Sequence, residues 1–254
     1  MLITTIFLHP GLRSLQLRLG TNGTPKPYFH PVLQFQSPIS LYSMRLVQID
    51  NESVLESLST AILHTRSLRE LTIWADADSN LALDILFRGW EDHATLELNI
   101  LELRGFTSLG QFPNFLWEKI PPTKLRELIL EVGSHFDVTE CLGFWKAATK
   151  AGLRPTVLST NLGAGGLKEF VDTFSGLEVF NILPSASSRP LEPLAPLIKC
   201  LQGQHSATIK VFAIRSQNSI ENYTLGPDQV TQLVRGFPEV KEFQFEVANV
   251  SEVR

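Results

Sequence analysis

The sequence predicts an α/β solenoid of about nine irregular repeats, a curved horseshoe with parallel strands on its concave face and helices outside. First, a short apolar pattern, Leu-x-x-Leu-x-Leu with conservative replacements, recurs nine times along the 254 residues. Second, the first positions of the copies are separated by 29, 27, 30, 27, 28, 24, 32 and 31 residues. Third, the segments between copies carry apolar residues at helical spacing. Self-similarity at a period of roughly 20 to 50 residues is typical of solenoids, and this apolar core is typical of leucine-rich repeats.

Each copy of the pattern predicts one short strand. The copies are Leu12/Leu15/Leu17, Leu41/Met44/Leu46, Leu68/Leu71/Ile73, Leu98/Leu101/Leu103, Leu125/Leu128/Leu130, Leu153/Thr156/Leu158, Leu177/Phe180/Ile182, Ile209/Phe212/Ile214 and Val240/Phe243/Phe245. Successive side chains of a strand point to opposite faces, so these positions are expected to face the core. The residues between them and just after them then face the concave surface.

A helix is expected between most successive strands. The clearest case runs from Glu52 to about His64, where apolar residues recur with a helical period. Further helices are expected over residues 81–90, 138–151, 167–174, 191–201 and 228–237. Strands joined by helical crossovers are parallel. The outer segment of the second unit is expected to be extended or a short turn, because it holds Pro25, Pro27, Pro31 and Pro38. The shortest step, between the sixth and seventh copies, should carry the shortest outer helix.

Composition favours an intracellular protein-binding domain over a nucleic-acid or membrane protein. The formal net charge is −4 and the chain has no basic stripe, so we expect no nucleic-acid partner. No apolar run reaches the roughly 18 residues of a membrane helix. The apolar N-terminal segment lacks the features of a signal peptide. The only cysteines are Cys141 and Cys200, so the paired-cysteine caps of secreted leucine-rich repeats are absent.

Two motifs resemble ligand-binding loops, but each is better explained as a turn of the repeat. The segment Asp76-x-Asp78-x-Asn80 resembles the start of a calcium loop, but Leu81 stands where glycine is needed and Phe87 where a bidentate glutamate belongs. It is interpreted as a polar turn after a strand. The cluster Gly163, Gly165, Gly166 and Lys168 follows a strand and precedes a helix, but it lacks the spacing of a phosphate-binding loop.

No catalytic site is predicted. The histidines are scattered near turns, where they are expected to cap helices or face solvent; they include His9, His30, His64, His93 and His205. Neither a metal-binding cysteine–histidine cluster nor a nucleophile elbow is present. The chain is therefore expected to be non-enzymatic and to bind no metal or cofactor.

The concave face is the predicted site for a protein partner. The early strands place arginines near a tryptophan, and the sixth to eighth strands add an apolar strip that includes Pro155 and Ala213. Such a combination suits a protein interface. Alternatively, the strip is covered by the chain's own loop over residues 184–196, or it reflects a drifting repeat. The predicted partner-binding residues are Arg18, Arg45, Trp74, Glu102, Arg104, Ile129, Val157, Val179, Leu183 and Val211.

The repeat resembles the ribonuclease-inhibitor-like and F-box-type leucine-rich repeats. The strand-to-helix turn Leu158-Ser-Thr-Asn-Leu-Gly-Ala-Gly-Gly166 is similar to the turn of those families. The resemblance implies that the side chain of Asn161 satisfies backbone groups and that the glycines supply positive φ before a helix at Leu167. The phrases Leu68-Arg-Glu-Leu-Thr-Ile73 and Leu125-Arg-Glu-Leu-Ile-Leu130 look like the leucine-rich region of fungal F-box proteins.

That resemblance implies substrate recognition for an SCF-type ubiquitin ligase, in which an N-terminal F-box binds an Skp1-like adaptor. No F-box pattern is present, and only 11 residues precede the first repeat. Residues 1–254 are therefore expected to form a single repeat domain that lacks an N-terminal module and end caps. Three alternatives remain open: substrate recognition, a structural or regulatory repeat protein unrelated to ubiquitin, and a nucleotide-dependent sensor.

Overall fold

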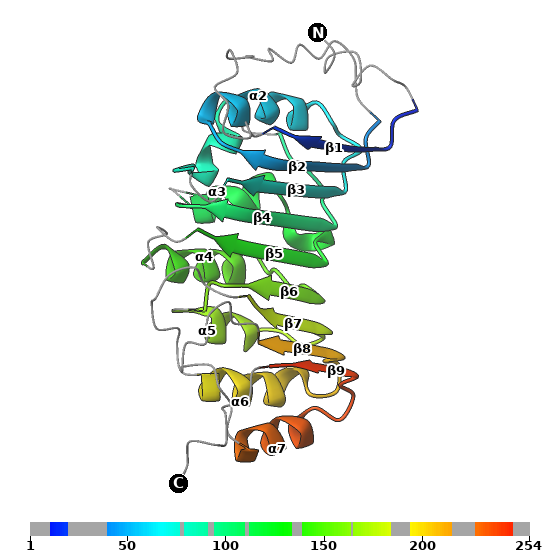
Figure 1. Ribbon diagram of the computed structural model, residues 1–254, viewed down its shortest axis with the longest axis vertical. Coiled ribbons are helices and arrows are strands. Elements are labelled where there is room, and N and C mark those ends of the chain that lie inside the picture. The colour runs from blue at the N-terminus through cyan, green and yellow to red at the C-terminus, as the bar shows by residue number, and fades with distance from the viewer. Residues whose placement is uncertain are drawn as a thin grey trace.

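The computed structural model describes residues 11–19, 40–76, 79–90, 94–109, 112–133, 139–163, 165–183, 194–214 and 227–245. Nine strands in these ranges form one parallel sheet, and each strand pairs with its neighbours in chain order. Figure 1 shows the strands stacked along the long axis of the molecule, with the labelled helices gathered on one side of the sheet. The predicted α/β class, the nine parallel strands and the helices between strands are confirmed.

The element bounds match the repeat closely. The strands are β1 (Ser14–Arg18), β2 (Ser43–Ile49), β3 (Glu70–Ala75), β4 (Ile100–Phe106), β5 (Glu127–Val132), β6 (Val157–Thr160), β7 (Val179–Ile182), β8 (Val211–Ile214) and β9 (Glu242–Gln244). The α-helices are α2 (Glu52–Leu63), α3 (Phe112–Lys119), α4 (Thr139–Lys150), α5 (Leu167–Val171), α6 (Leu194–His205) and α7 (Pro227–Gly236). Two 3-10 helices, η1 (Leu83–Phe87) and η2 (Pro122–Lys124), complete the described elements.

Alternation within the strands places the core on one face of the sheet. In β3, Leu71 and Ile73 are fully buried, whereas Glu70, Thr72 and Trp74 between them are partly exposed. Burying one such aliphatic side chain stabilises the fold by about 2 kcal/mol relative to leaving it in water. A slip by one residue would turn every apolar side chain outward, so the pattern fixes the register.

The sixth copy of the pattern lies two residues later than the sequence suggested. Leu158 pairs with Leu128, so the residue equivalent to Leu125 is Pro155, not Leu153. The steps on either side become 30 and 22 residues in place of 28 and 24. Pro155 is buried, and its predicted place on the concave face is wrong. Leu153 fits the leucine pattern better than Pro155 does, so the sequence alone favours the earlier frame.

In the corrected frame, a core position of β6 is polar. Thr160 is fully buried and pairs with Leu130. Its hydroxyl accepts a hydrogen bond from the backbone N–H of Leu162 at 2.9 Å, so the buried oxygen keeps a partner. Such a bond offsets the cost of burying a hydroxyl. A threonine can therefore replace leucine at this point of the repeat.

The helices follow the predictions with two exceptions. The shortest α-helix described, the five-residue α5, lies in the shortest step, as predicted. The helix expected over residues 81–90 is only the 3-10 helix η1, which is flanked by extended Ala82 and Arg88. Four of its five residues are buried, so it lacks a polar face on which a longer helix could be solvated. The second exception, α3, was not predicted; Pro113 stands at its second position, where proline is tolerated in a helix.

Aromatic rings join successive helices beneath the sheet. Trp145 of α4 stacks on Phe170 of α5, with ring centroids 4.9 Å apart. On one side of this pair, Phe144 contacts Trp145 and Trp117. On the other side, Phe174 contacts Phe170 and the imidazole of His205. Four consecutive helices therefore pack through one continuous column of rings.

The turn after β6 behaves as the resemblance implies. The buried side chain of Asn161 accepts a hydrogen bond from the N–H of Val132 and donates one to its carbonyl, both at 2.9 Å. Gly165 and Gly166 have φ of 72° and 92°, and α5 begins at the next residue. A Cβ at Gly166 would lie 3.2 Å from both Leu142 Cδ1 and Trp145 Cβ. The glycine cluster is thus accounted for by a tight turn packed against α4.

Several predictions fall outside the described residues. They are the proline-rich segment of the second unit, the apolar N-terminal residues 1–10, the chain beyond Phe245 and most of the loop over residues 184–196. Among the described helices, none combines the length and apolar character needed to cross a bilayer.

Candidate partner-binding surface on the open face of the sheet

The sheet face opposite the helices, here called the open face, carries three rows of side chains. The register places equivalent residues of neighbouring strands side by side. One row runs through Glu70, Ile100, Glu127 and Val157, and the next through Thr72, Glu102, Ile129 and Ser159. The third contains Trp74, Arg104 and Glu131. The open face is therefore one continuous surface across these neighbouring repeats.

Trp74 lies between two arginines. The Cζ atom of Arg45 is 4.4 Å from the centroid of the Trp74 ring, and that of Arg104 is 5.2 Å from it. A guanidinium over an aromatic ring is attracted by the ring quadrupole, by about 0.5–1 kcal/mol at an exposed site. All three side chains are partly exposed. The arginines thus hold the indole in place while leaving part of it open to a partner.

Glu102 joins this group through three donors. Its carboxylate accepts hydrogen bonds from the Trp74 indole N–H at 3.0 Å and the Thr72 hydroxyl at 3.3 Å. Arg104 donates its Nε–H to the same carboxylate at 2.5 Å and its Nη1 to Glu131 at 2.7 Å. These six residues, Arg45, Thr72, Trp74, Glu102, Arg104 and Glu131, are called the Trp74 cluster. Charge-assisted bonds across strands give the cluster a defined geometry before any partner binds.

The carboxyl group of Glu127 lies near two other acidic side chains beside the Trp74 cluster. Burial raises the pKa of Glu127 above its ordinary value, and the negative charges of Glu102 and Glu70 raise it further. Unlike Glu102 and Glu131, Glu127 has no ion pair with a described residue. A partner that brings a positive charge to this point would relieve the repulsion.

The apolar strip is narrower than predicted. Val157, Val179 and Val211 pair across β6, β7 and β8 and are half-buried, so they form an accessible valine strip. Leu183, by contrast, is only 7% exposed, and its predicted place on the concave surface is wrong. Ala213 is fully buried as well, so it adds no contact area. Leu183 follows the last residue of β7, where strand alternation no longer governs which way a side chain points.

The remaining predicted residues lie on the open face. Ile129 is half-buried and sits between Glu102 and Ser159. Arg18 is exposed on β1, and its Nε–H donates to the side chain of Gln48. The structure therefore brings Arg45, Trp74, Glu102 and Arg104 into one cluster and leaves Arg18 outside it. Thr72, Glu127 and Glu131 were not among the predicted binding residues, although alternation placed them on this face.

The described residues form no metal-binding group of three or more histidine, cysteine or acidic side chains. At the predicted polar turn, the carbonyl of Asp76 accepts hydrogen bonds from the backbone N–H and the hydroxyl of Ser79, at 3.0 and 2.6 Å.

His205 is buried, so the expectation that it faces solvent is wrong. Its Nδ1 accepts the N–H of Leu177 at 3.2 Å and its Nε2 lies 3.0 Å from the Val171 carbonyl, which fixes a neutral imidazole protonated at Nε2.

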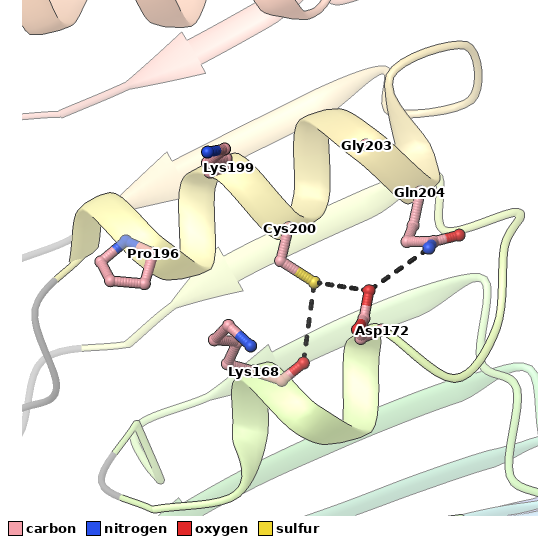
Figure 2. A pocket seen from close by; sticks show the side chains of 7 residues that line it. All are labelled: Lys168, Asp172, Pro196, Lys199, Cys200, Gly203 and Gln204. Carbon is pink, nitrogen blue, oxygen red and sulfur yellow. Dashed lines mark hydrogen bonds between the residues drawn. The ribbon is translucent and has the colours of Figure 1, made fainter.

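A hollow of about 280 Å³ between α5 and α6 contains a thiol. Figure 2 shows Cys200 directed towards Asp172 and the carbonyl of Lys168, with Gln204 bonded to the same carboxylate. Burial and the negative charge of Asp172 raise the pKa of Cys200 to about 11. The thiol therefore stays protonated at neutral pH and is a poor nucleophile.

No protein-family model, curated protein or solved structure matches this chain.

Proposed function

We propose that this protein is a non-catalytic scaffold that binds a protein partner on the open face of its sheet. The observation that carries the proposal is the pre-ordered Trp74 cluster on the same continuous face as the valine strip. Interfaces concentrate binding energy in tryptophan and arginine, supported by apolar surface. The Trp74 cluster would supply the residues that concentrate binding energy, and the valine strip would supply the apolar contact.

The proposed partner presents a mixed surface. A basic side chain would approach Glu127 and Glu70, and an apolar segment would lie along Val157, Val179 and Val211. Arg45 and Arg104 would meet acidic or carbonyl groups at the edge of the Trp74 ring. Complementary charges of this kind fix orientation and raise the association rate more than they raise affinity.

A combined substitution tests this proposal. The variant carries Arg45→Glu, Arg104→Glu, Val179→Asn and Val211→Asn, and its captured proteins are compared with those of the wild type by quantitative mass spectrometry. The amount of each captured partner should fall at least about tenfold, since the loss of one hot spot of about 2 kcal/mol already lowers affinity by more than a factor of ten. Equal capture by both proteins contradicts the proposal.

A matched control carries two charge reversals and two apolar-to-asparagine changes on the helix side of the molecule. Lys146→Glu and Lys150→Glu reverse two exposed charges of α4, while Leu142→Asn and Val234→Asn alter exposed apolar residues of α4 and α7. This control should capture the same proteins as the wild type, in similar amounts. Because four changes can unfold a domain, the pair Val179→Asn and Val211→Asn is measured as well, after circular dichroism has established that each variant is folded.

We further propose that the repeats are leucine-rich repeats and that the captured partner is a substrate of an SCF-type ubiquitin ligase. This step is supported by the resemblance of the repeats to those of fungal F-box proteins and by the nine-strand parallel sheet. The reading frame upstream of Met1 in the messenger RNA should then encode an F-box that binds an Skp1-like adaptor. A partner whose lifetime is unchanged in cells lacking this protein would favour a structural or regulatory role unrelated to ubiquitin.

A further inference from the structure

A second hollow, of about 440 Å³, lies at the edge of the sheet where the strands begin. It is lined by the turns that precede β4, β5 and β6, with Asn99 from the first, η2 and Arg126 from the second, and Arg154 from the third. Backbone hydrogen bonds join the turns. The N–H of Arg126 donates to the carbonyl of Asn99 at 2.9 Å, and the N–H of Thr156 donates to the carbonyl of Arg126 at 2.8 Å. The hollow is thus framed by three consecutive repeats, and none of its lining residues belongs to the Trp74 cluster or the valine strip.

Its charged lining is entirely basic. Lys124, Arg126 and Arg154 contribute three positive charges, and no acidic residue lines the hollow. Lys124 is paired with Glu97 at 2.6 Å. Neither arginine forms an ion pair with any other residue that the structure describes. The whole chain has a net charge of −4, so this local positive charge runs against the balance of the molecule.

We infer that this basic hollow is a binding site for a phosphomonoester. A guanidinium presents N–H donors in a planar fork that matches phosphate oxygens, and two such forks suit a dianion better than a single carboxylate. Thr123 and Asn99, which also line the hollow, add neutral hydrogen-bonding groups. The volume lies within the usual range of small-ligand sites, roughly 300–1,000 Å³. The phosphoryl group can belong to a phosphorylated side chain of a protein or to a small phosphate ester.

Titration with two probes distinguishes these sources. Inorganic phosphate carries the shared chemistry alone, and a capped peptide with one phosphoserine adds the surroundings of a protein side chain. Binding is followed by the amide and arginine signals in NMR spectra of the full chain at constant ionic strength. We expect saturable binding of both probes, at millimolar concentration for phosphate. Tighter binding of the peptide indicates a phosphoprotein, and equal binding indicates a free phosphate ester.

Substitutions localise the binding. The double variant Arg126→Gln with Arg154→Gln should bind both probes at least tenfold more weakly than the wild type. Each single change should weaken binding by a smaller factor. The control Arg13→Gln with Arg66→Gln removes the same charge from exposed arginines outside the hollow and should leave binding unchanged. Absence of saturable binding, or equal weakening in hollow and control variants, overturns the inference. Thermal melts show that each variant is folded, and the single variants serve if the double variant is not.

Discussion

At Glu127, burial and the repulsion of Glu102 and Glu70 act in the same direction on one carboxyl group. Its folded-state pKa is raised, so the fold favours the protonated form. The associated stability is present below the unfolded pKa of about 4.5 and is lost as pH rises through the folded pKa. At neutral pH the ionised carboxylate therefore destabilises the native state.

The variant Glu127→Gln should raise the free energy of unfolding by about 0.5 kcal/mol at pH 7, the scale of a cross-strand charge interaction. It should give no gain near pH 3.5, where the wild-type group is protonated. The matched variant Glu131→Gln removes the negative charge that pairs with Arg104 and should lower stability at pH 7. Urea unfolding at the two pH values measures both. If the two variants lower stability alike at pH 7, the repulsion at Glu127 is not significant.

His205 gives the fold a dependence on pH in the opposite direction. Burial lowers its pKa in the folded state, so the unfolded chain binds a proton more readily. Stability is then full above the unfolded pKa of about 6.5 and falls as pH drops. Protonation would also place a second N–H against the N–H of Leu177. The melting temperature should fall as the pH is lowered from 7.5 to 5.5, and the fall should be smaller in the variant His205→Gln.

At the scale of elements, the junction of β5, β6 and α5 depends on side-chain bonds to the backbone. Asn161→Ala should cost about 3 kcal/mol, because it leaves the buried N–H and carbonyl of Val132 without partners. Asn181→Ala, which removes one bond to the Ser159 hydroxyl on the open face, should cost less than about 1 kcal/mol. Equal costs in chemical denaturation would show that Asn161 does not hold the two repeats together.

The start of α5 depends on a glycine. Gly166→Ala should cost about 2 kcal/mol, since alanine is strained at φ of 92° and its Cβ would crowd Leu142 and Trp145. Gly203, inside α6, has nothing within 4 Å of an added Cβ. Gly203→Ala should therefore stabilise the protein by about 1 kcal/mol through helix propensity. Thermal denaturation that shows the same sign for both changes would contradict this account.

Sequence predicts the strands more securely than the segments between them. Strand alternation is a short-range pattern, and nine copies in one frame identified the pairs from Leu15 to Phe243. The frame failed at Pro155, where proline occupies a leucine position. Predicting η1 and α3 was harder, because their form depends on how much of each segment is buried by its neighbours. Leu183 was misplaced because alternation ends with the strand.

The candidate surface was predictable by face, but its contacts were not. Alternation placed Arg45, Trp74 and Arg104 on the open face. Their assembly around Glu102 depends on cross-strand register and on side-chain rotamers, which a single strand does not specify. The basic hollow was not foreseen, because its three turns are separated in sequence and meet only when successive repeats stack.

At the scale of the whole molecule, nine strands form one sheet with an open face, while the labelled helices pack on the other side (Figure 1). In a solenoid each repeat is stabilised by its neighbours, so the open face is free to vary in sequence without loss of the core. This separation explains why β2 to β5 carry charged groups and β6 to β8 carry valines on the same face.

Site-specific photo-crosslinking tests the binding role of the open face most directly. A photoreactive phenylalanine derivative is placed in the full chain at Ile129 or Val179 on the open face, and at Leu142 or Val234 on the helices. The open-face positions should crosslink the same protein partner in cells, and the helix positions should give at least tenfold less of it. A partner crosslinked only from Leu142 or Val234, or none from Ile129 and Val179, would contradict a binding role for the open face.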